Sequence, residues 1–202
     1  MPGQLKQLKG SDLFFKPSFF INKSAPLIRN AFSLERELSV MNERIKMIES
    51  ISIEQRLAEL EIQLPAASEP KGSYVNCVRA SNFLYVSGKG PTGQPVPVGK
   101  LGREFSVAQG YDFARMAGLE ILATVKAELG SLDAVVRVVK IQGFINAVES
   151  FEDHPEVLDG CSDLMAQVFG DKGLHARSVF GAMSVRANLP LVIDSIFEIN
   201  SA

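Results

Sequence analysis

Two stretches of the chain carry apolar residues at the three- and four-residue spacing of an amphipathic helix. The first follows Ser106, whose side chain can cap a helix N-terminus, and ends at Gly130, a residue type common just beyond a helix C-terminus. The second runs from His154 to Phe169 and stops at Gly170. The pattern therefore predicts two long helices, each with one apolar face turned toward a core.

Five other segments are rich in β-branched and aromatic residues, a composition typical of β-strands. Residues 74–78 and 83–86 are separated by a short polar segment and predict an antiparallel hairpin. The apolar run at 132–145 predicts a long central strand. Residues 176–185 and 189–199 predict two strands that complete the sheet.

The long elements follow one another in the order β-β-α-β-α-β-β. Both helices must pack on the same mixed sheet, because hairpin connections and helical crossovers alternate along the chain. We therefore expect a single-domain α+β fold over residues 51–202, with the two helices on one face of the sheet. A short helix capped by Ser52 and ended by Pro65 should precede the first strand.

Residues 1–50 differ in character from the rest of the chain. Lysines alternate with phenylalanines, and acidic residues are sparse before Glu35. We interpret this region as an N-terminal extension that is partly disordered, or that precedes a natural start at Met41 or Met47. An organellar transit peptide is the alternative, although lysine outnumbers arginine and serines are few. The spacing of apolar residues over 34–51 predicts a short amphipathic helix leading into the domain.

The composition narrows the classes of partner. The chain has 202 residues, of which 46% are hydrophobic, enough for one well-buried core. Because 21 basic residues are balanced by 23 acidic ones, for a net charge of -2, no basic surface for nucleic acid is predicted. No apolar run approaches the roughly 20 residues needed to cross a bilayer, so no membrane span is predicted. A small polar metabolite or a protein partner fits this balance.

The cysteines and histidines point away from disulfide and metal chemistry. Cys77 and Cys161 lie far apart, without the spacing of a metal site or a disulfide framework, and we expect both to be reduced packing residues in a cytoplasmic protein. The two histidines, His154 and His175, are too few for the usual zinc or iron ligand sets, so we predict no metal and no other cofactor. His154 is expected at a helix start.

Arg177 is the strongest candidate for a binding residue. It stands between apolar segments at the start of a predicted strand, where a permanently charged guanidinium needs an anionic partner or a wet cleft. It could clamp a substrate carboxylate, or it could form a salt bridge with an acid of the same chain, such as Asp194 or Glu198. His175 lies two residues earlier, on the same side of an extended chain, and could act as a general base or as a capping or surface residue.

Three short segments also match a known family in their order and spacing, namely Gly72-Ser73-Tyr74-Val75, Val86-Ser87-Gly88-Lys89 and Ala176-Arg177-Ser178. On these segments the chain resembles the YjgF/Rid (reactive intermediate deaminase) family, over roughly residues 52–199. The segments Gly99–Arg103 and Gly160–Leu164 are similar to a subgroup of that family with a longer loop and an N-terminal extension.

This resemblance implies a chorismate-mutase-like fold, a homotrimer with clefts between subunits, and cofactor-free hydrolysis of enamine or 2-imino acid intermediates to 2-keto acids and ammonia. Arg177 would clamp the substrate carboxylate and aim the adjacent C=N carbon at a water. Ser178 would lie beside it. Tyr74 would donate to the substrate or form the pocket wall, and the backbone of Gly88 would bond the imine or the ammonium product. Without the motif, Tyr74 reads equally as a half-buried strand residue and Gly88 as a turn glycine.

The chain departs from the family pattern at three places. The position at which many imine deaminases carry a water-orienting glutamate falls at Val192, although Asp194 lies two residues on and on the same side of the strand. Val179 stands where a cysteine often follows the arginine motif, and Asp159 where an asparagine is expected. An altered substrate, or a non-catalytic trimer that binds keto or imino acids, therefore stays open as the alternative to an enzyme.

Overall fold

The computed structural model describes residues 36–41 and 51–201. The chain divides into two compact units, residues 1–50 and 51–202. In the first unit, residues 36–41 are helical and lie within the predicted helix at 34–51. Residues 34–35 and 42–50 of the predicted helix, and the alternative start at Met47, lie outside the described residues, and Ile51 lies in a bend and not in a helix.

The second unit contains the predicted β-β-α-β-α-β-β order and has the expected α+β class. No helix among the described residues is long and apolar enough to span a membrane. The elements in chain order are α2 (Ile53–Glu59), β1 (Cys77–Ala80), β2 (Phe83–Lys89), α3 (Val107–Leu129), η1 (Leu132–Ala134), β3 (Val135–Asn146), α4 (His154–Phe169), η2 (Gly170–Gly173), β4 (Ala176–Ala182), η3 (Arg186–Asn188) and β5 (Leu191–Ile199).

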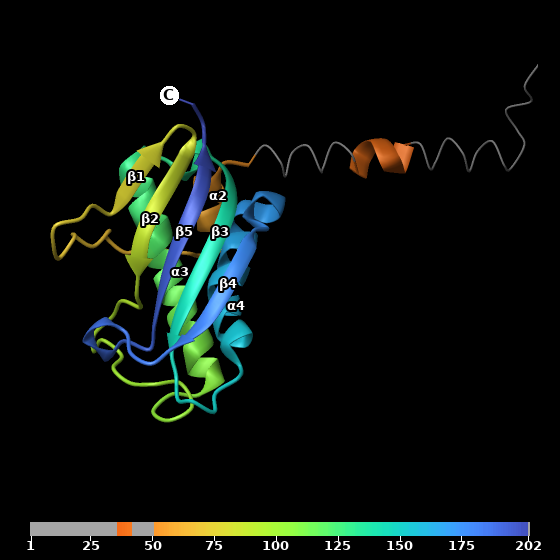
Figure 1. Cartoon of the computed structure of the whole chain (residues 1–202). Helices are drawn as coiled ribbons and strands as arrows, with labels where there is room; N and C mark the ends of the chain where they lie inside the picture. The colour runs from red at the N-terminus through yellow and green to blue at the C-terminus, as the bar shows by residue number, and fades with distance from the viewer. Residues whose placement is uncertain (1–35, 42–50, 202) are drawn as a thin grey trace, which may run out of the picture. The chain divides into compact units, whose positions relative to one another are not determined.

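The five strands form one mixed sheet in the order β1-β2-β5-β3-β4. β3 and β4 run parallel because α4 connects them as a crossover, whereas the pairs β1-β2, β2-β5 and β5-β3 are antiparallel. Figure 1 shows α3 and α4 together behind the sheet. The last strand, β5, is inserted between β2 and β3, so β1 and β4 are the two edges.

The ends of the longest helix follow from local chemistry. The Ser106 side chain accepts a hydrogen bond from the backbone N–H of Gln109, and the side-chain oxygen of Gln109 accepts one from the backbone N–H of Ser106, which forms a capping box. At the other end, Gly130 has a φ of 80°, a conformation that favours glycine. The sequence prediction for this helix is confirmed at both ends.

The short helix α2 is also capped as predicted, since Ser52 and Gln55 form a second capping box. Its C-terminus was predicted wrongly. The helix ends at Glu59, well before Pro65, because the chain turns through Glu61, which has a left-handed φ of 55°. Proline therefore lies in the following linker and does not set the boundary.

The core lies between the sheet and the two long helices. Alternate residues of β5 are buried against the helices, and those between them are half-buried on the other face, as the two-residue period of a strand requires. The two helices approach closely at Gly160, where a Cβ atom would lie 2.0 Å from the carbonyl oxygen of Tyr111. No side chain fits there, so glycine fixes the separation of α3 and α4.

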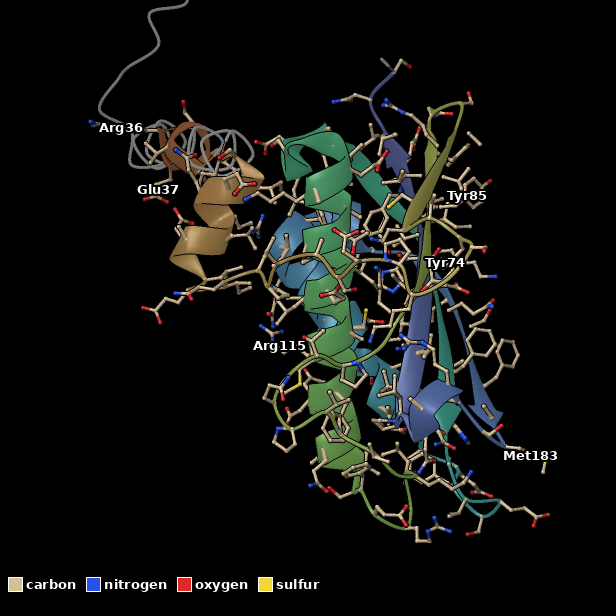
Figure 2. All side chains as sticks on the ribbon, turned by 90° about the vertical axis from the view of Figure 1, so that its left-hand side faces the viewer. Arg36, Glu37, Tyr74, Tyr85, Arg115 and Met183 are labelled. Carbon is tan, nitrogen blue, oxygen red and sulfur yellow. The ribbon has the colours of Figure 1, made fainter. Side chains whose placement is uncertain are left out.

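The sheet face that α3 and α4 leave uncovered carries several large apolar side chains. Phe144 on β3 and Phe180 on β4 lie side by side, with ring centroids 6.1 Å apart. Tyr85 on β2 is exposed on the same face, and Figure 2 shows it on the side of the sheet away from α3.

Candidate functional site

Two of the predicted site residues, Tyr74 and Gly88, line one cavity of about 290 Å³ at the end of β2. Its walls come from the linker before β1, the loop after β2, the middle of α3 and the η3 segment. Figure 2 shows Tyr74 in that linker, on the sheet side of α3. The cavity is thus built from segments far apart in sequence.

Gly88 is required by the packing around it. A Cβ atom at this position would lie 2.6 Å from Cγ1 of Val192 on the neighbouring strand. Val192 occupies the position at which the family pattern has a glutamate. The residue that replaces this glutamate therefore lies directly beside Gly88. Tyr74 is half exposed, and its hydroxyl accepts a hydrogen bond from the backbone N–H of Lys71 at 3.4 Å.

Arg177 lies on the opposite edge strand, β4. Three strand spacings separate β2 from β4 in the sheet, which is about 14 Å at roughly 4.8 Å per strand. Within one chain, Arg177 is therefore not brought together with Tyr74 and Gly88.

Arg177 already has partners in its own chain. Its Nη1 donates to Oδ1 of Asp159 and, at 3.3 Å, to Oγ of Ser162, both on α4. The salt bridge that the sequence left open is thus formed with Asp159, and not with Asp194 or Glu198. The reason is that Arg177 lies on the face of the sheet that the helices cover, whereas Asp194 and Glu198 lie on the uncovered face. The neighbour of Arg177 on β3, Ile141, is buried under the helices.

His175 and Arg177, which share one side of the extended chain, both contact the hydroxyl of Ser162. Nε2 of His175 lies 3.2 Å from Oγ of Ser162, and its Nδ1 lies 2.6 Å from the carbonyl oxygen of Gly173. That carbonyl can only accept, so Nδ1 carries the proton and Nε2 accepts from the Ser162 hydroxyl. Burial lowers the pKa of His175, and the Arg177 charge lowers it further against the opposing Gly173 hydrogen bond.

Ser178 and Asp194 lie on the other side of the sheet from Arg177. Both are aligned with Gln142 of β3, Ser178 in the parallel pair and Asp194 in the antiparallel pair, so the three form a row on the uncovered face. Burial raises the pKa of the Asp194 carboxyl, and the charge of Lys140 opposes that shift.

The cavity floor contains a charged pair that sequence reasoning missed. Nζ of Lys89 lies 3.9 Å from Oε1 of Glu120, and both side chains are buried. One signal for Glu120 was present in the sequence. It lies three residues after Ala117, on the inward face of the predicted helix, where an acid is out of place.

Ser162 was missed for a different reason. It lies in the segment Gly160–Leu164, which marked the subgroup, and three residues after Asp159, so both project from the same side of α4. Only the crossover that sets α4 beside β4 reveals its contact with Arg177.

The wall formed by η3 is fixed by Asn146, which is fully buried. Its Nδ2 lies 3.0 Å from Oδ1 of Asn188 and 3.0 Å from the carbonyl oxygen of Leu189, and its Oδ1 accepts from Nζ of Lys100 at 2.9 Å. Ala187 and Asn188 have left-handed φ values of 53° and 52°. These bonds hold a strained segment in place.

Cys77, Cys161 and His154 do not line this cavity. Among the described residues, no group of three histidine, cysteine or acidic side chains could hold a metal ion. Cys77 and Cys161 are free thiols. Burial raises the pKa of Cys77 to about 11 and that of Cys161 to about 12. His154 begins α4, as predicted, and packs edge-on against Phe151.

Comparison with known proteins agrees with this fold. A family model described as "YjgF/chorismate mutase-like, putative endoribonuclease" matches residues 54–197. Protein TCP17 of Trypanosoma cruzi is 34% identical over 160 residues, which cover 78% of this chain and all of that protein. The structure of protein Atu1372 from Agrobacterium tumefaciens, of unknown function, is 39% identical, with a TM-score of 0.67 over 73% of this chain and 92% of that one. A "putative endoribonuclease" from Shewanella oneidensis is 27% identical, with a TM-score of 0.70 over 74% of this chain and all of that one.

Proposed function

Since the chain belongs to the YjgF/chorismate mutase-like family, we propose that it binds small 2-imino acids and hydrolyses them to 2-keto acids and ammonia. The water oxygen bonds to the C=N carbon, the π electrons pass to nitrogen, and one proton of the water follows them to give a neutral carbinolamine. The hydroxyl proton then transfers to nitrogen, the C–N bond breaks, and ammonia leaves as the C=O bond of the keto acid forms. The acceleration would come from holding the substrate carboxylate and the attacking water in a fixed geometry. The reaction changes no oxidation state, so it needs no redox cofactor.

One observation carries the proposal. Tyr74 and Gly88 line a cavity at one end of β2, whereas Arg177 lies on the far edge strand. A homotrimer would let the β4 edge of one copy meet the cavity of the next, so that each site takes its pocket from one chain and its arginine from another. The uncovered apolar sheet face is consistent with such an assembly.

The substrate carboxylate would replace Asp159 as the partner of Arg177. The guanidinium has five N–H donors, of which the contacts to Asp159 and Ser162 use Nη1 alone. A planar carboxylate can take two parallel hydrogen bonds from the same fork. Binding at Arg177 is therefore an exchange of one carboxylate for another.

A second candidate function is non-catalytic binding of keto or imino acids. Two observations favour it, namely that Val192 has no carboxylate to orient a water and that Arg177 is already paired with an acid. Saturable binding of 2-oxobutanoate without any acceleration of imine hydrolysis would establish this function in place of the first.

The test of the first function measures ammonia and keto-acid release from 2-iminopropanoate and 2-iminobutanoate, generated in situ by an amino-acid oxidase or dehydratase. We expect wild type to accelerate release and Arg177→Ala to lose about a hundredfold of that acceleration, because the carboxylate is no longer positioned. Arg103→Ala, which removes an exposed arginine paired with Glu104, is the matched control. Full activity in a folded Arg177→Ala variant would exclude the clamp.

A mixing experiment tests whether sites are shared. Tyr74→Ala and Arg177→Ala chains, each inactive alone, are unfolded, mixed in equal amounts and refolded. Sites shared around a three-fold ring would regain about a quarter of wild-type activity, because random assembly pairs an intact pocket with an intact arginine at that frequency. Recovery of none would mean that each site lies within one chain.

A further inference from the structure

The floor of the cavity holds two opposite charges that solvent scarcely reaches. Lys89, at the end of β2, is 4% exposed and Glu120, in the middle of α3, is 1% exposed. Charged side chains are almost never buried to this degree unless they are paired. Because the two charges compensate each other, the floor is neutral overall.

A chain of hydrogen bonds links the two side chains through the linker before β1. Nζ of Lys89 donates to Oδ1 of Asn76 at 2.7 Å, and Nδ2 of Asn76 donates to the carbonyl oxygen of Ser68 at 2.7 Å. The backbone N–H of Ser68 then donates to Oε1 of Glu120 at 2.8 Å. The chain fixes both residues, but it uses one oxygen of the carboxylate only.

The second oxygen, Oε2 of Glu120, is buried without any hydrogen-bond partner among the described residues. Leaving a charged acceptor unpaired in the interior costs more free energy than a typical hydrogen bond returns. Since Glu120 lines the cavity, a group bound there can supply the missing donor.

The charges around the cavity give a bound ligand a direction. Three further charged residues line it, namely Lys71, Arg186 and Glu69, and all three are exposed, in contrast to the buried pair at the floor. Nη2 of Arg186 lies 3.8 Å from the position of a Cβ atom at Gly90, so this guanidinium stands over the loop after β2. Two cations against one acid favour an anionic group at the exposed side of the cavity, where Arg177 of a neighbouring copy would also lie in the proposed trimer, and Glu120 favours a donor group at the floor.

We propose that Glu120 is the specificity residue of this cavity, its free Oε2 accepting a hydrogen bond from an N–H or O–H on the carbon next to a ligand carboxylate. The inference rests on the proposed function, because it names the part of the site that reads the nitrogen of a 2-imino acid. It selects ligands with a donor at that carbon, as in imino, amino and hydroxy acids, over 2-oxo acids, which have only acceptors there.

Two ligands of equal size test this preference by titration calorimetry on the full chain. 2-Hydroxybutanoate has the donor and 2-oxobutanoate lacks it. We expect wild type to bind the hydroxy acid about tenfold more tightly, the factor that one hydrogen bond to a charged acceptor supplies. In Glu120→Gln the amide oxygen still accepts from Ser68 and the amide N–H groups face the cavity. The hydroxy acid should then lose its tenfold advantage.

Glu128→Gln is the matched control, because Glu128 is an exposed acid on the same helix, and it should keep the wild-type preference. If Glu120→Gln loses its cooperative unfolding transition, Lys89→Gln/Glu120→Gln removes both charges together and permits the same comparison. Equal affinities of wild type for the two acids, binding of neither, or an unchanged preference in the variant would each overturn the proposal. Loss of the preference in Glu120→Gln supports the role of Glu120 even when the protein hydrolyses no imine. Failure of the specificity proposal can therefore be told apart from failure of the proposed hydrolysis.

Discussion

Arg177 on β4 and Asp159 on α4 form a salt bridge, and Ser162, one turn further along the helix, accepts a hydrogen bond from the same guanidinium nitrogen. The charge of the predicted clamp is thus compensated inside its own chain before any ligand arrives. The pair is partly exposed, with side-chain exposures of 31% for Arg177 and 44% for Asp159. Solvent therefore screens it, and exchange for another carboxylate costs little.

Asp159→Asn should tighten the binding of 2-oxobutanoate roughly threefold to fivefold, the range that a partly exposed ion pair is worth. Asparagine keeps an acceptor for Arg177 but removes the competing charge. Calorimetry at low ionic strength measures the effect. Asp163→Asn is the control, because Asp163 bonds the hydroxyl of Tyr111 and not Arg177. Unchanged or weaker binding in Asp159→Asn would argue against a ligand carboxylate at Arg177.

His175 should make the folded protein less stable in mild acid. Its pKa is lowered in the folded state from an unfolded value near 6.5, chiefly by burial. The unfolded chain therefore binds more protons than the folded one below about pH 6.5. The contribution of neutral His175 to the free energy of unfolding is fully present above that pH and is lost as the pH falls toward the folded pKa. Urea unfolding between about pH 5 and 7.5 measures the slope.

The same titration with His175→Asn isolates this contribution. Asparagine cannot take up a proton, so the variant should have a flatter profile than wild type over the same interval. Profiles of equal slope in wild type and His175→Asn would contradict the assignment of the acid sensitivity to this residue.

Gly88→Ala should destabilise the fold by about 1–3 kcal/mol, because the new methyl group overlaps the stiff side chain of Val192. Val192→Ala removes the atom in the way, so the double variant should be more stable than Gly88→Ala alone. Gly72→Ala is the control, since a Cβ there meets nothing closer than 3.5 Å. Additive losses in the double variant would mean that Gly88 and Val192 do not constrain each other.

Asn146→Ala should cost about 3 kcal/mol, because it removes one acceptor of the half-buried Lys100 ammonium and leaves two buried or half-buried acceptors around η3 without their shared donor. The η3 segment should also be cut faster by proteases. Asn82→Ala, which removes one hydrogen bond to Glu198, should cost less than about 1 kcal/mol. Similar losses from the two substitutions, measured by urea unfolding, would show that Asn146 has no special role.

The order of the elements was predictable from local signals. The spacing of apolar residues, the helix-capping side chains and the glycines just beyond helix ends each depend only on residues that are close in sequence. Ser106 and Gly130 bound α3 in the structure as they do in the sequence. The end of α2 was not predictable from Pro65, since the helix stops at Glu59, just before the left-handed turn at Glu61. Local signals thus describe where an element is favoured, and tertiary contacts decide how far it extends.

The site was predictable only in part. Short motifs gave Tyr74 and Gly88, which do share a cavity, but not the strand order that sets Arg177 about three spacings away. The partner of Arg177 was missed because Asp159 is eighteen residues earlier in the chain, and only the crossover through α4 brings the two together. Pairing across such a distance has no local sequence signal.

The contact at Gly160 limits how this site can change during evolution. Asp159 is partly exposed, so its charge can be altered by a single substitution with little disturbance to the fold. Its neighbour has no such freedom, because even alanine would push α4 away from the Tyr111 backbone and carry Asp159 and Ser162 with it. Ligand preference at Arg177 can therefore drift through position 159, while position 160 must remain glycine for as long as the two helices keep their present separation.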